Sequence, residues 1–328
     1  MVPDMEASAH PMSVLQRTRH RYDQIGDRLL YALTAAAALF AMAIIALIIW
    51  EVADGSRQAF RHFGLSFIWG NTWNPNPVHE IYGARQYIYG TLLTSFGAIL
   101  LAAPLSIAIG LFLSELAPKG IKSPVASLVE MLAAVPSVVV GLWGILVLGP
   151  FMRTDIEPFL HSILGWTPFF TGNPSQAGIL VAIVVLTMMA LPITSSICRE
   201  LFSGVPRELK EAAIGLGATR WEMIRGVVFP QVRGGIVAGI MLGLGRALGE
   251  AIAVTPVIGN LIPLHLSLFK GGNTLASEMA SNFAGAGTTL EVSSLFALGL
   301  ILLAITFITN VGAQRIVHRF EGQRVGGR

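Results

Sequence analysis

The chain has 328 residues, of which 53% are hydrophobic and 12% charged, and its formal net charge is +3. The apolar residues are concentrated in runs too long for soluble helices, which predicts an integral membrane protein. The small positive charge needs no nucleic-acid partner to account for it. The single cysteine, Cys198, excludes an internal disulfide and argues against a thiolate metal cluster.

Six windows are apolar enough to cross a membrane, for which a helix needs about 20 largely apolar residues. They are residues 29–50, 89–114, 125–149, 177–198, 233–258 and 292–314. We therefore expect an all-α membrane protein with one transmembrane permease domain, 29–314, between terminal tails at 1–28 and 315–328. The first window has the length of a full span and follows a polar segment, so we expect a retained helix and not a cleaved signal peptide.

The distribution of lysine and arginine predicts the orientation. Six spans place both chain ends on the same side of the membrane. Most of the 22 basic residues lie in the two tails, in the second connector and in residues 199–233. Because basic residues are enriched on the cytoplasmic side, we expect a multi-pass protein of the cytoplasmic (inner) membrane with both termini in the cytoplasm.

The connector between the fourth and fifth windows is longer than ordinary helix connections, which run about 2–8 residues. Pro206 suits the first turn of a helix, and Gly217 predicts a left-handed residue that ends it. Thr219 and Glu222 have the spacing of a capping box, which predicts the start of a second short helix. Pro230 is expected to end that helix.

The same connector has a spaced pattern of residues. Glu-Ala-Ala is followed after three residues by Gly, and after nine more residues by an aliphatic residue, any residue, an apolar residue and Pro. It resembles the cytoplasmic coupling motif of ABC importer permeases, which implies a type I ABC importer permease fold and a coupling loop at 206–230. The matching positions are Glu211, Ala212, Ala213, Gly217, Val227, Phe229 and Pro230. Glu211, Ala212, Ala213, Gly217 and Pro230 are the expected ATPase-coupling residues, because the small side chains of Ala212 and Ala213 let another backbone approach closely.

The chain carries no P-loop, since none of its lysines follows a glycine in the frame that such a loop requires. ATP is therefore expected to be bound and hydrolysed by a separate partner chain. We expect a transport subunit and not an enzyme, with no cofactor of its own. The histidines show no i, i+4 pair inside a window, so no metal site is expected.

The fifth window contains Arg246 near mid-depth and Glu250 four residues further on. A charge there costs at least about 2.5–3.5 kcal/mol on insertion scales, so both side chains should face protein or a wet pathway. Gly235, Gly239 and Gly243 lie along the same predicted stripe and permit close helix packing. The charged pair is either part of a substrate pathway, with Arg246 offering donors to an oxyanion, or an ion pair that neutralises itself within the bundle.

Two further runs, Gly243–Val254 and Ala134–Gly144, resemble phosphate-specific transport permeases of the PstC type, and the similarity extends from about residue 85 to 314. The resemblance implies ATP-driven import of inorganic phosphate, with this chain forming half of the translocation pathway and Arg246 and Glu250 associated with transport. It also implies partners. They are a second permease of the PstA type, two P-loop ATPases of the PstB type, an external phosphate-binding protein of the PstS type, and membrane lipid.

Two alternatives remain open at the level of the sequence. One is a permease of the same architecture for another oxyanion, such as molybdate, sulfate or phosphonate. The other is a self-sufficient channel or ion-coupled carrier, which should show an internal repeat or several buried ionisable groups. The sequence shows no repeat and only the one intramembrane pair.

Overall fold

The computed structural model describes residues 14–261 and 264–325, which belong to two units divided between Asp54 and Gly55. The first unit consists of a single long helix, α1 (Val14–Gly55). Its large apolar side chains from Leu29 to Trp50 are exposed, as expected of a helix that faces lipid. Of the predicted N-terminal tail, residues 1–13 lie outside the described residues, and helix α1 covers the remainder.

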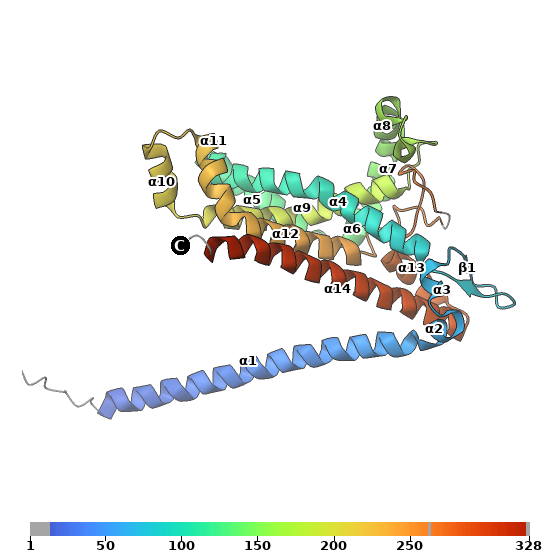
Figure 1. Ribbon diagram of the computed structural model, residues 1–328, viewed down its shortest axis with the longest axis horizontal. Helices are drawn as coiled ribbons and strands as arrows, with labels where there is room; N and C mark the ends of the chain where they lie inside the picture. The colour runs from blue at the N-terminus through green and yellow to red at the C-terminus, as the bar shows by residue number, and fades with distance from the viewer. Residues whose placement is uncertain (1–13, 262–263, 326–328) are drawn as a thin grey trace, which may run out of the picture. The chain divides into compact units, whose positions relative to one another are not determined.

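The second unit is an α-helical bundle with one short hairpin (Figure 1). The hairpin pairs β1 and β2 antiparallel, with Trp73 opposite Tyr82 and Asn74 opposite Ile81. The elements are α2 (Arg57–Phe63), α3 (Ser66–Trp69), β1 (Trp73–Asn74), β2 (Ile81–Tyr82), α4 (Arg85–Leu111), α5 (Lys119–Ala134), α6 (Ser137–Trp143), α7 (Gly149–Phe151), α8 (Glu157–Leu164), α9 (Ile179–Ser203), α10 (Arg207–Gly215), α11 (Arg220–Met223), α12 (Phe229–Gly249), α13 (Leu275–Asn282) and α14 (Thr289–Val325).

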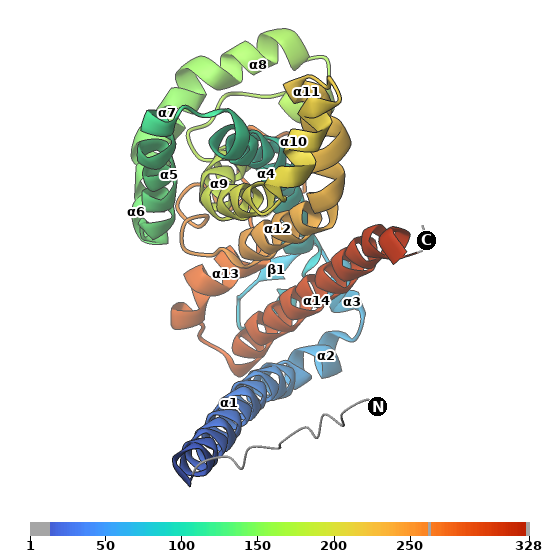
Figure 2. The same ribbon diagram turned by 90° about the vertical axis from the view of Figure 1, so that its left-hand side faces the viewer.

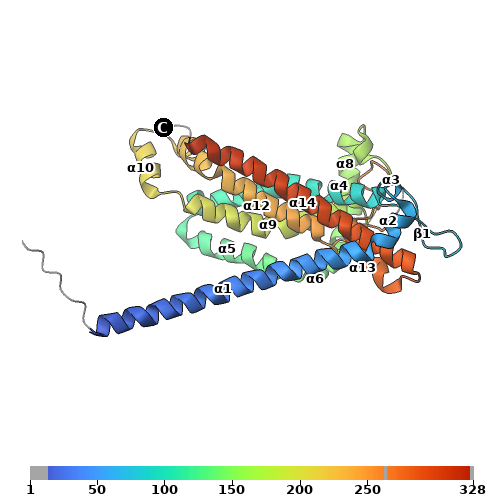
Figure 3. The ribbon, with the colours of Figure 1, turned by 60° about the horizontal axis from the view of Figure 1, so that its bottom comes forward.

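Six helices among the described residues are long and apolar enough to cross a membrane, which confirms the predicted number. They run Gly26–Phe63, Arg85–Leu116, Ser137–Leu164, Ile179–Ser203, Arg220–Gly249 and Thr289–Arg315. The long helices of the bundle lie side by side, so the connectors gather at its two ends. In Figure 3, α10 and α11 lie at one end, and α2, α3, β1 and α13 lie at the other.

Helix α9 is the most deeply buried of the six, and it packs against α4 and α12 (Figure 2). The predicted glycine stripe of α12 provides this packing. A Cβ on Gly235 would lie 2.7 Å from the Leu201 side chain, and a Cβ on Gly243 would lie 2.6 Å from Thr194 Oγ1. Both contacts are closer than side chains tolerate, so the stripe permits close approach of α12 and α9, as the sequence predicts.

Four π-helical turns widen these helices, and each ends two residues before a proline. The turns are Phe112–Leu116, Gly144–Leu148, Met152–Ile156 and Ile224–Val228, and the prolines are Pro118, Pro150, Pro158 and Pro230. In every turn the residue just before the proline donates its N–H to the carbonyl five residues back. A proline lacks an N–H and crowds the carbonyl four residues back, so a wider turn relieves the clash. Except at Pro118, the helix then continues.

The third predicted span, 125–149, differs from the structure. It is broken in the middle, because α5 ends at Ala134 and the next helical run begins at Ser137. Val135 and Pro136 have extended backbone, with ψ of 126° and 138°. Proline disfavours helical geometry in the residue before it, which accounts for the break. The apolar membrane-length helix runs instead from Ser137 to Leu164.

The fifth predicted span, 233–258, also differs, because α12 ends at Gly249. The non-helical segment that follows packs across the first turn of α9. The N–H groups at a helix start have no partner within the helix, and carbonyls of this segment accept three of them. Gly178 donates to Val257 at 2.9 Å, Ile179 to Lys270 at 3.0 Å, and Leu180 to Leu268 at 2.8 Å. The segment is thus a structured cap on α9.

Candidate functional site

The coupling element consists of α10, a turn and α11. Gly217 has a φ of +90°, and no heavy atom lies within 4 Å of where its Cβ would be, so the backbone conformation and not lack of space favours glycine there. Thr219 Oγ1 accepts from the N–H of Glu222, and Glu222 Oε2 accepts from the N–H of Thr219 at 2.8 Å. The structure therefore confirms the predicted turn and capping box.

The second helix of this element does not end at Pro230, as the sequence analysis expects. Pro230 follows the π-helical turn Ile224–Val228, and this wider turn accommodates a residue that has no N–H. The π-helical turn joins α11 to α12, so Arg220–Gly249 is one helical run of 30 residues. The coupling element is therefore continuous with a membrane helix and is not a separate loop.

One ion pair ties α10 to the bundle. Lys210 Nζ lies 2.5 Å from Glu115 Oε1, and these side chains are only 14% and 12% exposed. Lys210 also donates to the carbonyl of Phe202 at 3.1 Å. Both residues line a groove of about 350 Å³, which Lys122 lines as well. The pair was missed in the sequence because its members are far apart in the chain, although an acidic residue at the end of an apolar window indicates a need for a partner.

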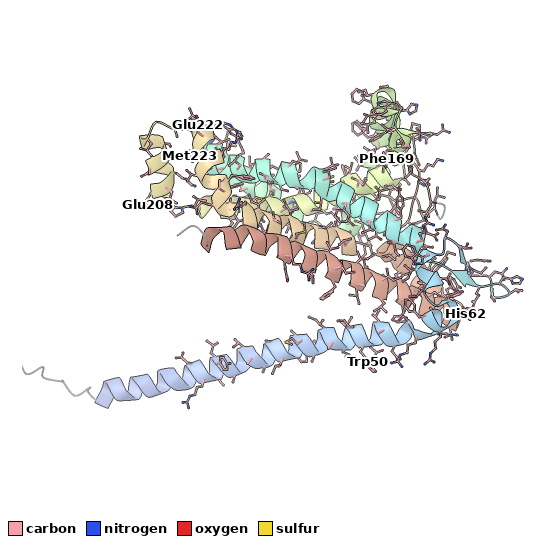
Figure 4. All side chains as sticks on the ribbon, viewed as in Figure 1. Trp50, His62, Phe169, Glu208, Glu222 and Met223 are labelled. Atoms are coloured by element: carbon pink, nitrogen blue, oxygen red, sulfur yellow. The ribbon has the colours of Figure 1, made fainter. Side chains whose placement is uncertain are left out.

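The five predicted coupling positions do not share one environment. Glu211, Ala212, Gly217 and Pro230 are exposed, whereas Ala213 is half-buried against the chain's own core. The small size of Ala213 therefore serves packing within this chain as well. Figure 4 marks this end of the bundle by Glu208, Glu222 and Met223.

Large apolar side chains are exposed on the coupling element. Leu216 is 90% exposed at the turn and Trp221 is 64% exposed on α11.

Arg246 lies on α12, and its side chain is exposed in this single chain. It lines a cavity of about 10 Å³ together with Val135 and Val140, on either side of the break between α5 and α6, and with Met189 of α9. The broken third span and the arginine of the fifth span therefore face one another. Sequence reasoning places Arg246 within the fifth span, but it does not bring this residue beside the third span.

Glu250 does not continue the stripe of Arg246. Its ψ of 112° is not helical, so Glu250 lies just beyond the end of α12. Its half-buried side chain accepts through Oε1 from the N–H of Ala253, three residues further along the chain, at 3.2 Å. Among the described residues, neither Arg246 nor Glu250 forms an ion pair. The alternative of an i, i+4 ion pair between them is therefore not seen in this conformation, because the helix ends at Gly249, between the two residues.

The described residues contain no group of histidine, cysteine and carboxylate side chains that could hold a metal ion. The arrangement is a membrane bundle with an exposed two-helix connector, a continuous helix that leads from this connector into the bundle, and an arginine beside a broken helix. These features define the membrane-spanning subunit of an ABC importer.

Comparisons with known proteins place the chain within this class. The family described as "Binding-protein-dependent transport system inner membrane component" matches residues 106–322. The phosphate transport system permease protein PstC of Mesorhizobium japonicum is 42% identical over 301 residues, covering 90% of this chain and 91% of that protein. PstC of Pasteurella multocida is 43% identical, covering 87% and 89%. The chain belongs to the PstC family of inner-membrane transport permeases.

Solved structures share the fold at low identity. A bacterial alginate ABC transporter, in complex with an alginate pentasaccharide-bound periplasmic protein, matches with a TM-score of 0.58 and 17% identity, covering 90% of this chain and 97% of that one. The MetNI methionine ABC transporter, in an inward-facing conformation, matches with a TM-score of 0.53 and 19% identity, covering 71% and 94%. The fold is that of type I ABC importer permeases.

Proposed function

We propose that this chain forms half of the translocation pathway of an ATP-driven importer of inorganic phosphate. The observation that carries the proposal is the unbroken helical run from Arg220 in the coupling element to Gly249, with Arg246 near its far end. The PstC relatives support phosphate as the substrate. These relatives give no support to the alternatives of another oxyanion, a channel or an ion-coupled carrier.

The proposed partners follow from the same class. A second permease of the PstA type completes the pathway, two ATPases of the PstB type bind ATP, and a PstS-type protein delivers phosphate from outside. The distribution of basic residues supports a cytoplasmic location for both termini and the coupling element, where an ATPase can reach them. This chain needs no cofactor of its own.

The mechanism that we propose is mechanical. About 26 residues separate Arg220 from Arg246, which is about 40 Å of helix at 1.5 Å per residue. Movement of the ATPases shifts the 206–230 element, and the continuous helix transmits the shift to the arginine. The bundle thereby exposes the pathway to one side and then to the other.

Arg246 is the residue that we propose to contact phosphate. Its guanidinium carries a fixed positive charge and a fork of donors that fits an oxyanion. In this conformation no carboxylate neutralises it, so the positive potential is available to a substrate. Glu250 lies at the hinge where the helix ends, and its proposed role is to limit how tightly the anion is held when the pathway rearranges.

The test is phosphate uptake normalised to the amount of assembled complex. Arg246→Gln keeps hydrogen-bond donors but removes the charge, and we expect it to abolish uptake without loss of assembly. Arg246→Lys keeps the charge without the fork and should retain a small part of the activity. Arg153→Gln, which removes another exposed arginine, is the matched control and should transport normally. Normal uptake by Arg246→Gln would exclude the proposed contact with phosphate.

A further inference from the structure

Three residues with buried polar atoms line one small cavity at the end of the bundle opposite the coupling element. The atoms are the amide oxygen of Gln86, the hydroxyl of Tyr89 and Nδ1 of His265, and none has a hydrogen-bond partner among the described residues. Gln86 is only 4% exposed. Buried polar groups are nearly always hydrogen-bonded, so three in one place require an explanation.

The walls of the cavity come from α4 and from the non-helical segment after α12, and they are in close backbone contact. A Cβ on Gly90 would lie 1.9 Å from the carbonyl oxygen of Asn273. Beside this contact, the N–H of Leu275 donates to Thr91 Oγ1 at 2.9 Å. These contacts fix the spacing of the two walls, so the polar atoms cannot meet one another by a simple collapse of the cavity.

The donors and acceptors identify the chemistry of the missing partner. His265 Nε2–H donates to the carbonyl of Gly271 at 2.7 Å, so Nδ1 of the neutral ring is an acceptor. The Gln86 oxygen also needs a donor, whereas the Tyr89 hydroxyl needs an acceptor. An anion would satisfy only the donors and a cation only the acceptors. Water satisfies both kinds of group.

The size of the cavity fixes the number of molecules. Its volume is about 10 Å³, and one water needs roughly 10–15 Å³ of such space. A phosphate ion, with five heavy atoms, does not fit.

We propose that this cavity holds a single ordered water, which joins α4 to the segment that caps α9. The water donates to the Gln86 oxygen and to His265 Nδ1 and accepts from the Tyr89 hydroxyl. Three hydrogen bonds are typical of a buried structural water. The site goes beyond the proposed transport function and stands on different residues, so the two proposals can fail separately.

A structure of the assembled complex, at a resolution that shows ordered water, tests the site directly. We expect one isolated peak in contact with Gln86, Tyr89 and His265. An empty cavity, or direct hydrogen bonds between these side chains in place of the peak, would overturn the proposal.

A double-mutant cycle tests the same site in solution. Gln86→Met nearly preserves the shape of the side chain but removes both polar atoms, and His265→Phe removes the opposite partner. Gln86→Met should speed amide hydrogen exchange at residues 271–275 by about two- to tenfold, as expected for loss of one hydrogen bond. His265→Phe should speed it more, because it also removes the bond from Nε2–H to the carbonyl of Gly271. Because both side chains bind the same water, the double variant should exchange little faster than the worse single variant.

The control is Gln58→Met on α2, an exposed glutamine outside the cavity, which should leave exchange at residues 271–275 unchanged. Fully additive effects of the two cavity variants would show that Gln86 and His265 act separately and would contradict a shared water. If a single variant fails to fold, the peak in the wild-type structure still decides the matter.

Discussion

At the coupling end of the bundle, apolar side chains such as Leu216 and Trp221 are exposed and a single buried ion pair, Lys210 with Glu115, ties α10 to the rest. The opposite end also exposes apolar side chains, such as Leu65 and Trp69, but it buries a set of polar side chains that bond to one another. Asn273 Nδ2 donates to Glu278 Oε2 at 2.6 Å, and both side chains are at most 5% exposed.

The contrast indicates different mechanical roles. Exposed apolar groups, which occur at both ends, can bind another chain. Buried and mutually bonded polar groups have few alternative arrangements of similar energy, so the opposite end is built to keep one geometry. A force applied at the first end can then move the long helices against a fixed frame.

The largest effect is expected from breaking the ion pair at the coupling end. Lys210→Met leaves Glu115 nearly buried without its counter-charge, which typically costs about 3–5 kcal/mol. We expect a lower melting temperature of the permease and weaker ATPase stimulation in the complex. Lys122→Met, another lysine of the same groove, is the control and should behave nearly as wild type. Equal effects of the two substitutions would show that the charge of the groove matters, and not the pair.

Gly90→Ala tests the rigidity of the opposite end. The new Cβ would lie 1.9 Å from the Asn273 carbonyl oxygen, so the backbone has to move, at a typical cost of about 1–3 kcal/mol. Thermal unfolding of the purified permease is the measurement. Gly226→Ala, in a helix with no atom within 4 Å of the new Cβ, is the matched control. A wild-type melting temperature for Gly90→Ala would mean that this contact is soft.

Gly217→Ala separates conformation from space at the coupling end. An alanine has room there but is strained at a φ of +90°, at a cost of roughly 1–2 kcal/mol. We expect a modest loss of phosphate uptake with assembly unchanged. Gly215→Ala, in the last turn of α10 where the site is equally open, should be neutral or slightly stabilising. If both variants transport equally well, the turn tolerates another backbone geometry.

The smallest effect concerns pH at the opposite end. Burial raises the pKa of Glu278 above the usual 4.5. A raised folded-state pKa means that the folded chain binds the proton more tightly. This contribution to stability is therefore complete below pH 4.5 and is lost as pH rises through the folded-state value. Glu278→Gln should flatten the fall of melting temperature over this range, whereas Glu208→Gln on exposed α10 should not. An unchanged slope in Glu278→Gln would place the titration elsewhere.

Local features of the sequence predict local structure well. The Thr219 and Glu222 capping box and the positive φ of Gly217 depend on residues within a few positions, and both are present. The spacing of glycines along α12 likewise predicts its close packing, because helical periodicity alone brings them to one face. The number of membrane helices follows from length and hydropathy in the same way.

Features that depend on distant residues could not be predicted. The Lys210 and Glu115 pair joins segments 95 positions apart. The end of α12 at Gly249 also differs from the prediction, and the segment that follows it packs across the distant helix α9. Pro230 misled for another reason: proline usually ends a helix, but a π-helical turn lets this one continue.

The four π-helical turns also set angles. An α-helix advances about 100° per residue, so one extra residue in a turn rotates everything beyond it by about that amount. The turn at Ile224–Val228 therefore sets the angle about the helix axis between the coupling element and Arg246. Pro230 favours this wider turn. Pro230 thereby determines which way the coupling element faces. Replacing it would let the π-helical turn become α-helical and would turn the same side of α11 in a different direction.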